Sequence, residues 1–113
     1  MREDLIRIIA GKKKLTSILM TTFNIDLLFI ERVLLSSLHR CGNPTLTILA
    51  DADEIASSFR SHGKWINQIG RRYRVVPIRM SKGFRFHPKA VLLSGKDDAD
   101  LLIGSDNITF GGM

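Results

Sequence analysis

Two short segments near the end of the chain combine side chains that suit chemistry on a phosphodiester. His87 and Lys89 stand two residues apart, and Ser105 and Asn107 follow with the same spacing. An imidazole can attack phosphorus as a nucleophile, and a lysine ammonium can neutralise a phosphate oxygen. A hydroxyl and a carboxamide supply uncharged donors that orient the group being transferred. The four side chains together predict a phosphoryl-transfer site that needs no set of metal ligands.

Both segments adjoin stretches with the character of strands. Residues 84–93 and 99–103 are mostly apolar, and residues 94–98 between them are typical of a turn. Side chains two apart in a strand project from the same face. An antiparallel hairpin that closes near Lys96 or Asp97 therefore brings the histidine and lysine within cross-strand reach of the serine and asparagine. A shift of one residue in register would turn one of the two pairs to the other face.

The two segments together resemble the signature of the phospholipase D superfamily. A His-x-Lys spacing alone is common, but here the segment that begins at His87 is followed by Gly-Ser-Asp-Asn, ending at Asn107, after the next expected strand. The Ile-Thr-Phe-Gly-Gly tail that follows resembles that of bacterial nuclease-type members, including restriction or defence-type nucleases. The matching motif residues lie within residues 86–112.

This resemblance implies a metal-independent phosphodiesterase, and above all an endonuclease. In the family, the histidine forms a phosphohistidine intermediate, and a second histidine from a partner half acts as the general acid. The resemblance places His87, Lys89, Ser105 and Asn107 in the catalytic site and implies no cofactor and no metal. One motif supplies only half of such a site. We therefore expect a homodimer or pairing with a second motif.

Two departures from the family pattern keep an alternative open. The aspartate usually found five residues after the lysine falls on Ser94, although Asp97 and Asp98 lie in the turn nearby. Family members also carry an acidic residue farther beyond the asparagine than Met113, so we expect a domain truncated at its C-terminal end. Both departures favour a nucleic-acid-binding or dimerisation module that does not cleave. A lipid phosphodiesterase is less favoured, since no interfacial apolar helix is evident.

The composition favours a polyanionic partner. The 113 residues contain 17 Lys and Arg against 11 Asp and Glu, which gives a formal net charge of +6. Such a charge attracts nucleic acid or an acidic membrane surface, and we expect nucleic acid, with DNA favoured over RNA. The basic residues gather at positions 12–14, 71–74 and 79–85.

Secretion and membrane insertion have little support in the sequence. Cys41 is the only cysteine, so no internal disulfide can form, and the zinc-type Cys/His spacings are missing. The N-terminus lacks the long apolar core of a signal peptide, and charged residues interrupt the apolar stretch 25–38. We therefore expect a cytoplasmic protein without stable membrane association.

The expected elements alternate along the chain. Strands are predicted at residues 15–23, 45–50 and 73–80, with helices at residues 25–39 and within 51–70, ahead of the hairpin. This order predicts a single α/β domain over residues 1–113, with a mixed, mainly parallel sheet flanked by helices, as in one half of a phospholipase D-like protein. A flavodoxin-like fold is less favoured, because residues 94–98 are too few for a connecting helix.

Several other polar or aromatic residues are better explained by structure than by chemistry. A helix cap accounts for Asp51 and Asp53 more simply than a metal pair does. His39 is expected to end a helix and His62 to lie in a helix break, while Trp65 and the phenylalanines are expected in the core. Weak ligand contacts at the carboxyl end of the first strand are expected from Thr21, Thr22 and Asn24.

Overall fold

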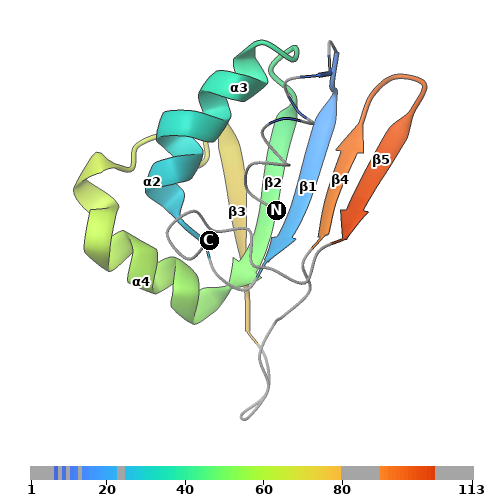
Figure 1. Ribbon diagram of the computed structural model, residues 1–113. Coiled ribbons are helices and arrows are strands. Elements are labelled where there is room, and N and C mark those ends of the chain that lie inside the picture. The colour runs from blue at the N-terminus through green and yellow to red at the C-terminus, as the bar shows by residue number, and fades with distance from the viewer. Residues whose placement is uncertain are drawn as a thin grey trace.

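The computed structural model describes residues 7, 9, 11–12, 14–22, 25–79 and 90–103, and all structural statements below concern these residues. They form one sheet with helices packed against it (Figure 1). The elements are β1 (Ser17–Thr22), α2 (Leu27–Phe29), η1 (Ile30–Leu34), α3 (Leu35–His39), β2 (Thr45–Asp51), α4 (Ala52–His62), η2 (Gly63–Trp65), β3 (Tyr73–Ile78), β4 (Ala90–Ser94) and β5 (Ala99–Ile103).

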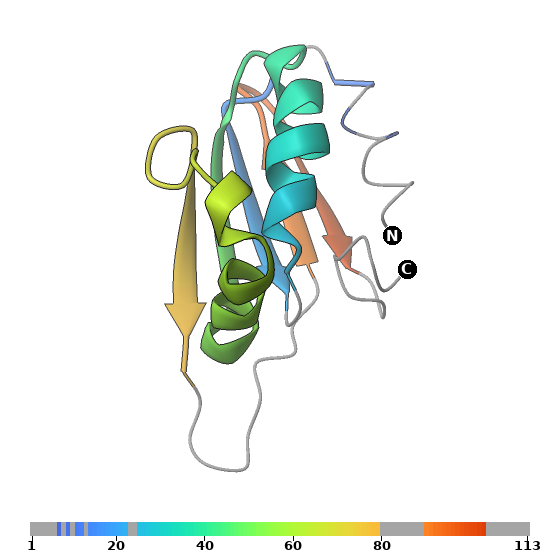
Figure 2. The same cartoon turned by 90° about the vertical axis from the view of Figure 1, so that its left-hand side faces the viewer.

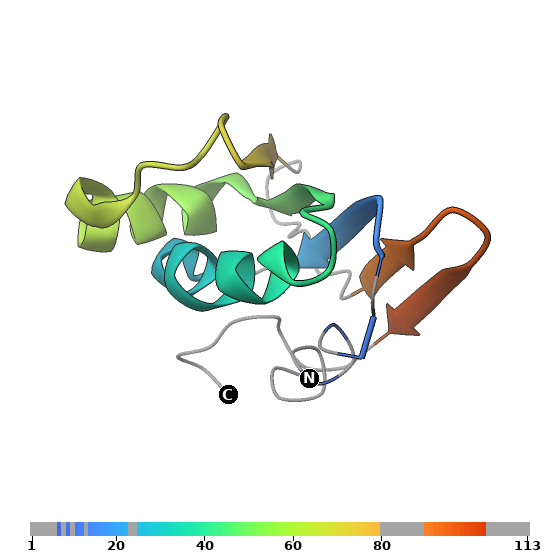
Figure 3. The ribbon, with the colours of Figure 1, turned by 90° about the horizontal axis from the view of Figure 1, so that it is seen from above.

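The sheet has the strand order β3-β2-β1-β4-β5. The first three strands are parallel, β4 runs antiparallel to β1, and β5 runs antiparallel to β4. The predicted α/β class with a mixed sheet and a closing hairpin is therefore confirmed. The described helices lie on one face of the sheet, which Figures 2 and 3 show from the side and from above. Within the described ranges, no helix is long and apolar enough to cross a membrane.

The core lies between this helical layer and one face of the sheet. Alternation in the central strands places every second side chain there, with Ile18 and Met20 from β1 and Leu46 and Ile48 from β2. Val91 and Leu93 continue the same face onto β4, since they pair with Met20 and Ile18. The hairpin is thus anchored by the same core as the parallel strands.

A π-helical turn interrupts the predicted helix over residues 25–39. The helix begins after Asp26, whose carboxylate accepts from the amide of Phe29 at 3.1 Å, and continues through η1 to His39. The apolar stripe keeps ordinary helical spacing through the π turn, since its buried residues are Leu27, Ile30, Leu34, Leu35 and Leu38.

The π turn also holds Glu31, which fastens the connection into β3. Its two carboxylate oxygens accept hydrogen bonds from the amides of Asn67 and Gln68, each at 3.0 Å, and from the hydroxyl of Tyr73 at 2.9 Å. A charged acceptor makes each of these bonds stronger than a neutral one. The loop between η2 and β3 is therefore tied to the helical layer.

The Glu31 contact makes the ionisation of Tyr73 a test of this packing. Burial, and then the neighbouring Glu31 carboxylate, raises the pKa of Tyr73 above its ordinary value of about 10. Because Tyr73 is the single tyrosine, ultraviolet titration reports it alone. We expect almost no phenolate at pH about 11 in the folded protein, against a midpoint near pH 10 in denaturant.

The sign of the linkage follows from this raised pKa. The folded state holds the phenol proton of Tyr73 more tightly than the unfolded state does. The contribution of protonated Tyr73 to the free energy of unfolding is therefore complete below pH about 10 and is lost as the pH rises. A titration of the native protein with a midpoint near 10 would contradict the buried placement.

Two predicted core aromatics are exposed. Trp65 and Phe59 expose 47% and 41% of their surface, so their assignment to the core was wrong. Trp65 is exposed because it lies past the end of α4 at His62, whereas Phe59 lies within α4 but outside the buried side of that helix. Ala52 and Ser58 are buried in their place, and Ile55 packs against the core.

Candidate functional site

One edge of the sheet gathers the strand ends that lead toward the predicted site residues. The three parallel strands end there, at Thr22, Asp51 and Ile78. Ala90 at the start of β4 pairs with Thr21, and Ile103 at the end of β5 pairs with Ala90. The hairpin therefore begins and ends at this same edge, called the carboxyl edge below, which lies at the bottom of Figure 1.

The four predicted catalytic residues lie outside the described residues. Those residues are His87, Lys89, Ser105 and Asn107. In the sequence, the lysine directly precedes β4, and the Gly-Ser-Asp-Asn segment directly follows β5. The structure thus brings the attachment points of both segments together on adjacent strands, and a pocket shared by the four side chains stays a prediction.

The turn of the hairpin closes where the sequence predicts. The amide of Gly95 donates to the carbonyl of Asp98 at 2.9 Å, and Ser94 pairs with Ala99. The strands flanking this turn are antiparallel, as expected. The predicted strand over residues 84–93 is confirmed from Ala90 onward, and its earlier residues lie outside the described ranges.

Thr21 holds the start of β4. Its hydroxyl accepts from the amide of Ala90 at 3.1 Å and donates to the carbonyl of the same residue at 3.5 Å. The sequence had indicated a ligand contact for Thr21, and the structure gives its hydroxyl a positioning role one residue away from Lys89. Thr22 is buried on the face covered by helices, and Asn24 lies outside the described residues.

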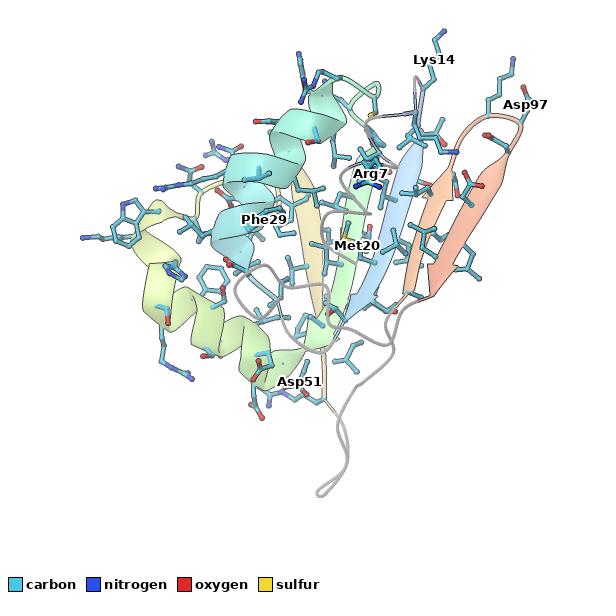
Figure 4. All side chains as sticks on the ribbon, in the orientation of Figure 1. Arg7, Lys14, Met20, Phe29, Asp51 and Asp97 are labelled. Carbon is cyan, nitrogen blue, oxygen red and sulfur yellow. The ribbon has the colours of Figure 1, made fainter. Side chains whose placement is uncertain are left out.

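Asp51 caps α4, as the sequence predicts. Its carboxylate accepts from the amides of Asp53 and Glu54 at 3.0 and 3.3 Å. The residue is almost buried, with 8% of its surface exposed, and lies at the carboxyl edge (Figure 4). In the described ranges, no three His, Cys, Asp or Glu side chains come close enough to hold a metal ion. Capping is therefore the interaction that the structure assigns to Asp51.

The two described histidines lie away from the carboxyl edge. His39 ends α3, is exposed, and has its Nδ1 3.3 Å from the Nδ2 of Asn43. His62 ends α4, about 16 Å along the helix from the carboxyl edge, and its ring lies 6.5 Å from that of Trp65. The buried Nδ1 of His62 has no hydrogen-bond partner among the described residues. Both positions agree with structural roles.

The position that departs from the family pattern lies at the other end of β4. Ser94 is about 13 Å along the strand from Ala90, at the edge where the parallel strands begin, called the amino edge below. Its carbonyl accepts from the amide of Thr16 at 2.8 Å and from the hydroxyl at 3.0 Å. Asp97 and Asp98 lie in the turn at this same edge, where Figure 4 labels Asp97. None of these three residues reaches the carboxyl edge.

Neither a family model nor a curated protein matches this chain. The resemblance to the phospholipase D superfamily therefore stays a prediction, which rests on the motif residues themselves. The sheet topology adds one observation to the motif. The adjacent strands β4 and β5 adjoin the two motif segments at the same edge of the sheet.

The positioning roles of Thr21 and Glu31 could not be predicted from the sequence. Thr21 contacts Ala90, 69 residues away, and Glu31 contacts Tyr73, 42 residues away, so no local pattern links either pair. The sequence does show that Glu31 is a charged residue within a mostly apolar helical stretch. That pattern is equally typical of a side chain that faces solvent, so it does not indicate a contact with Tyr73.

Proposed function

We propose that this chain is a metal-independent phosphodiesterase that cleaves nucleic acid through a phosphohistidine on His87, with the site completed by a second copy of the motif. The observation that carries the proposal is the pairing of Ala90 with Ile103 at the carboxyl edge. Lys89 adjoins the first of these residues in the sequence, and the Gly-Ser-Asp-Asn segment adjoins the second. Ligands of open α/β sheets commonly bind outside the carboxyl ends of the strands.

The observed register sets one condition on the proposed pocket. Val91 and Leu102 pair and share the face covered by helices. If side chains continued to alternate between the two faces along both strands, His87 and Lys89 would fall on that face. Ser105 and Asn107 would then fall on the opposite face. The proposal therefore requires the regular pairing to stop, or to gain one residue, after Ile103. A glycine follows directly, and glycine permits the backbone of a bulge.

The proposed reaction has two steps. In the first, a ring nitrogen of His87 attacks phosphorus, the bond to the leaving oxygen breaks, and the partner copy's histidine donates a proton to that oxygen. In the second, water attacks phosphorus and gives its proton to the partner histidine, and the bond between phosphorus and nitrogen breaks. Lys89 and Asn107 stabilise charge on the phosphoryl oxygens in both steps.

The charge of the chain supports nucleic acid as the substrate. The net charge of +6 favours a polyanion, and a homodimer would double it. Two-fold pairing is also the commonest symmetry of small assemblies, and it would place two copies of the motif across one phosphate.

The test is cleavage of labelled single-stranded and duplex DNA at low salt in excess chelator. We expect cutting that the chelator does not suppress, and a product that stays covalently bound when the reaction is quenched early. Cutting that depends on added divalent metal would overturn the phosphohistidine mechanism. Binding without any cutting would support the alternative, a nucleic-acid-binding module.

A further inference from the structure

Two adjacent hollows lie at the amino edge of the sheet. The proposed phosphodiesterase site lies at the opposite, carboxyl edge. Their volumes are about 340 and 370 Å³, and both are lined by Thr45, Arg71 and Arg72. The first continues to Thr47 and Arg74 along β2 and β3, and the second lies against the end of α3. We infer that these hollows form one basic groove, which binds the phosphate backbone of a nucleic-acid strand.

The positive charge of this groove is not neutralised within the described residues. The one ion pair found there joins Lys12 and Asp100, so Arg71, Arg72 and Arg74 have no carboxylate partner. A terminal nitrogen of Arg72 donates to the side-chain oxygen of Asn43 at 3.4 Å, which orients the guanidinium without cancelling its charge. Three exposed guanidinium groups in one place attract a polyanion.

The acidic side chains of the described chain are directed elsewhere. The carboxylate of Glu31 does not line either hollow and is engaged by the amides of Asn67 and Gln68 and the hydroxyl of Tyr73. The aspartates of the hairpin turn share the amino edge but belong to β4 and β5, at the other end of the sheet, about 14 to 19 Å away by strand spacing. The amino edge is thus basic beside β3, whereas at the hairpin turn Lys96 accompanies Asp97 and Asp98, and Lys12 pairs with Asp100.

The loop that carries the arginines is held in place before any ligand binds. The amides of Arg71 and Arg72 donate to the carbonyl of Gln68 at 3.0 and 2.9 Å, and the amide of Gly70 donates to the carbonyl of Tyr73 at 2.7 Å. Gly70 has a φ of +80°, which only glycine adopts readily. A preformed loop lowers the entropic cost of binding.

The lining chemistry favours a nucleic-acid strand over a membrane. Guanidinium groups match pairs of phosphate oxygens, and the hydroxyl of Thr47 adds an uncharged donor. The two hollows share Arg71 and Arg72, so together they offer a continuous basic surface to a chain of phosphates. The large apolar side chains that are exposed, namely Leu19, Val33, Phe59, Trp65 and Leu101, line neither hollow, whereas a membrane-docking surface needs them.

The groove is separate from the proposed phosphodiesterase site. A strand of this sheet separates the two edges by about 20 Å, which corresponds to about six base pairs of duplex. Binding in the groove needs no cleavage, so the inference stands or fails independently of the chemistry on His87.

The test compares two double variants, each made together with His87→Ala to prevent cleavage. Arg71→Gln with Arg72→Gln alters the groove, and Arg60→Gln with Lys96→Gln removes the same charge from exposed positions outside it. Fluorescence anisotropy with labelled oligonucleotides of single-stranded and duplex DNA measures affinity as a function of salt. We expect the groove variant to bind at least about tenfold more weakly, with a slope of log affinity against log salt reduced by about 1 to 2, and the matched variant to change less than about twofold.

Three outcomes would overturn the inference. Equal losses in the two double variants would assign binding to net charge alone, and unchanged binding by the groove variant would exclude the groove. If the groove variant lost binding to vesicles of anionic phospholipid but kept its binding to DNA, the groove would be a membrane contact. The fluorescence of Trp65, the single tryptophan, checks that each variant is folded.

Discussion

Replacing His87 with alanine is expected to lower cleavage of DNA at least about 10³-fold while leaving the fold intact, because the substitution removes the proposed nucleophile. In the sequence, His87 lies between β3 and β4. Initial rates in excess chelator measure the effect, and circular dichroism with thermal unfolding checks the fold. Covalent labelling of the chain by a phosphate-labelled substrate should disappear in the variant.

His62→Ala is the matched control for the nucleophile. His62 ends α4, about 16 Å along the helix from the carboxyl edge, and it lines neither of the two basic hollows. We expect its cleavage rate to stay within about twofold of the parent, because its side chain has no part in the proposed chemistry or in the groove. Retention of full activity by His87→Ala, or equal losses in the two variants, would remove His87 from the mechanism.

The largest expected effect on stability comes from Leu34→Ala. Leu34 is completely buried in the π turn, and truncation of a buried leucine costs about 2 to 5 kcal/mol through lost burial and the cavity left behind. Val33, its neighbour in the chain, exposes 41% of its surface, so Val33→Ala should cost less than about 1 kcal/mol.

Urea unfolding followed by the fluorescence of Trp65 measures both variants. A substantial drop in midpoint is expected for Leu34→Ala and a small one for Val33→Ala, with similar slopes. Equal midpoints for the two variants would contradict the burial of Leu34 and the exposure of Val33.

The order and type of the described elements could be predicted from sequence because each has a local signal. Apolar runs mark β1 and β2, an aspartate caps α4, and a short polar turn joins β4 to β5. These signals depend on neighbours in the chain, so they need no knowledge of the tertiary fold.

The features that sequence reasoning missed depend on contacts between distant residues. The π turn has no signal in the sequence, because the buried residues before and after it keep ordinary helical spacing. Trp65 was predicted in the core by its residue type, yet its position past the end of α4 exposes it. The motif residues carry the functional hypothesis, and the structure adds which strands they adjoin.

The place of β4 in the sheet has a consequence for how the protein folds. The parallel strands are joined by short crossovers, but β4 pairs with β1 through contacts such as Thr21 with Ala90, which are 69 residues apart. Closing so long a loop is entropically costly, so we expect the three parallel strands and their helices to form first and the hairpin to dock afterwards. On a ribosome, the segments that flank the hairpin would meet only after the chain has emerged as far as Asn107. The proposed nuclease would therefore stay inactive while this domain is being synthesised, close to the cell's RNA.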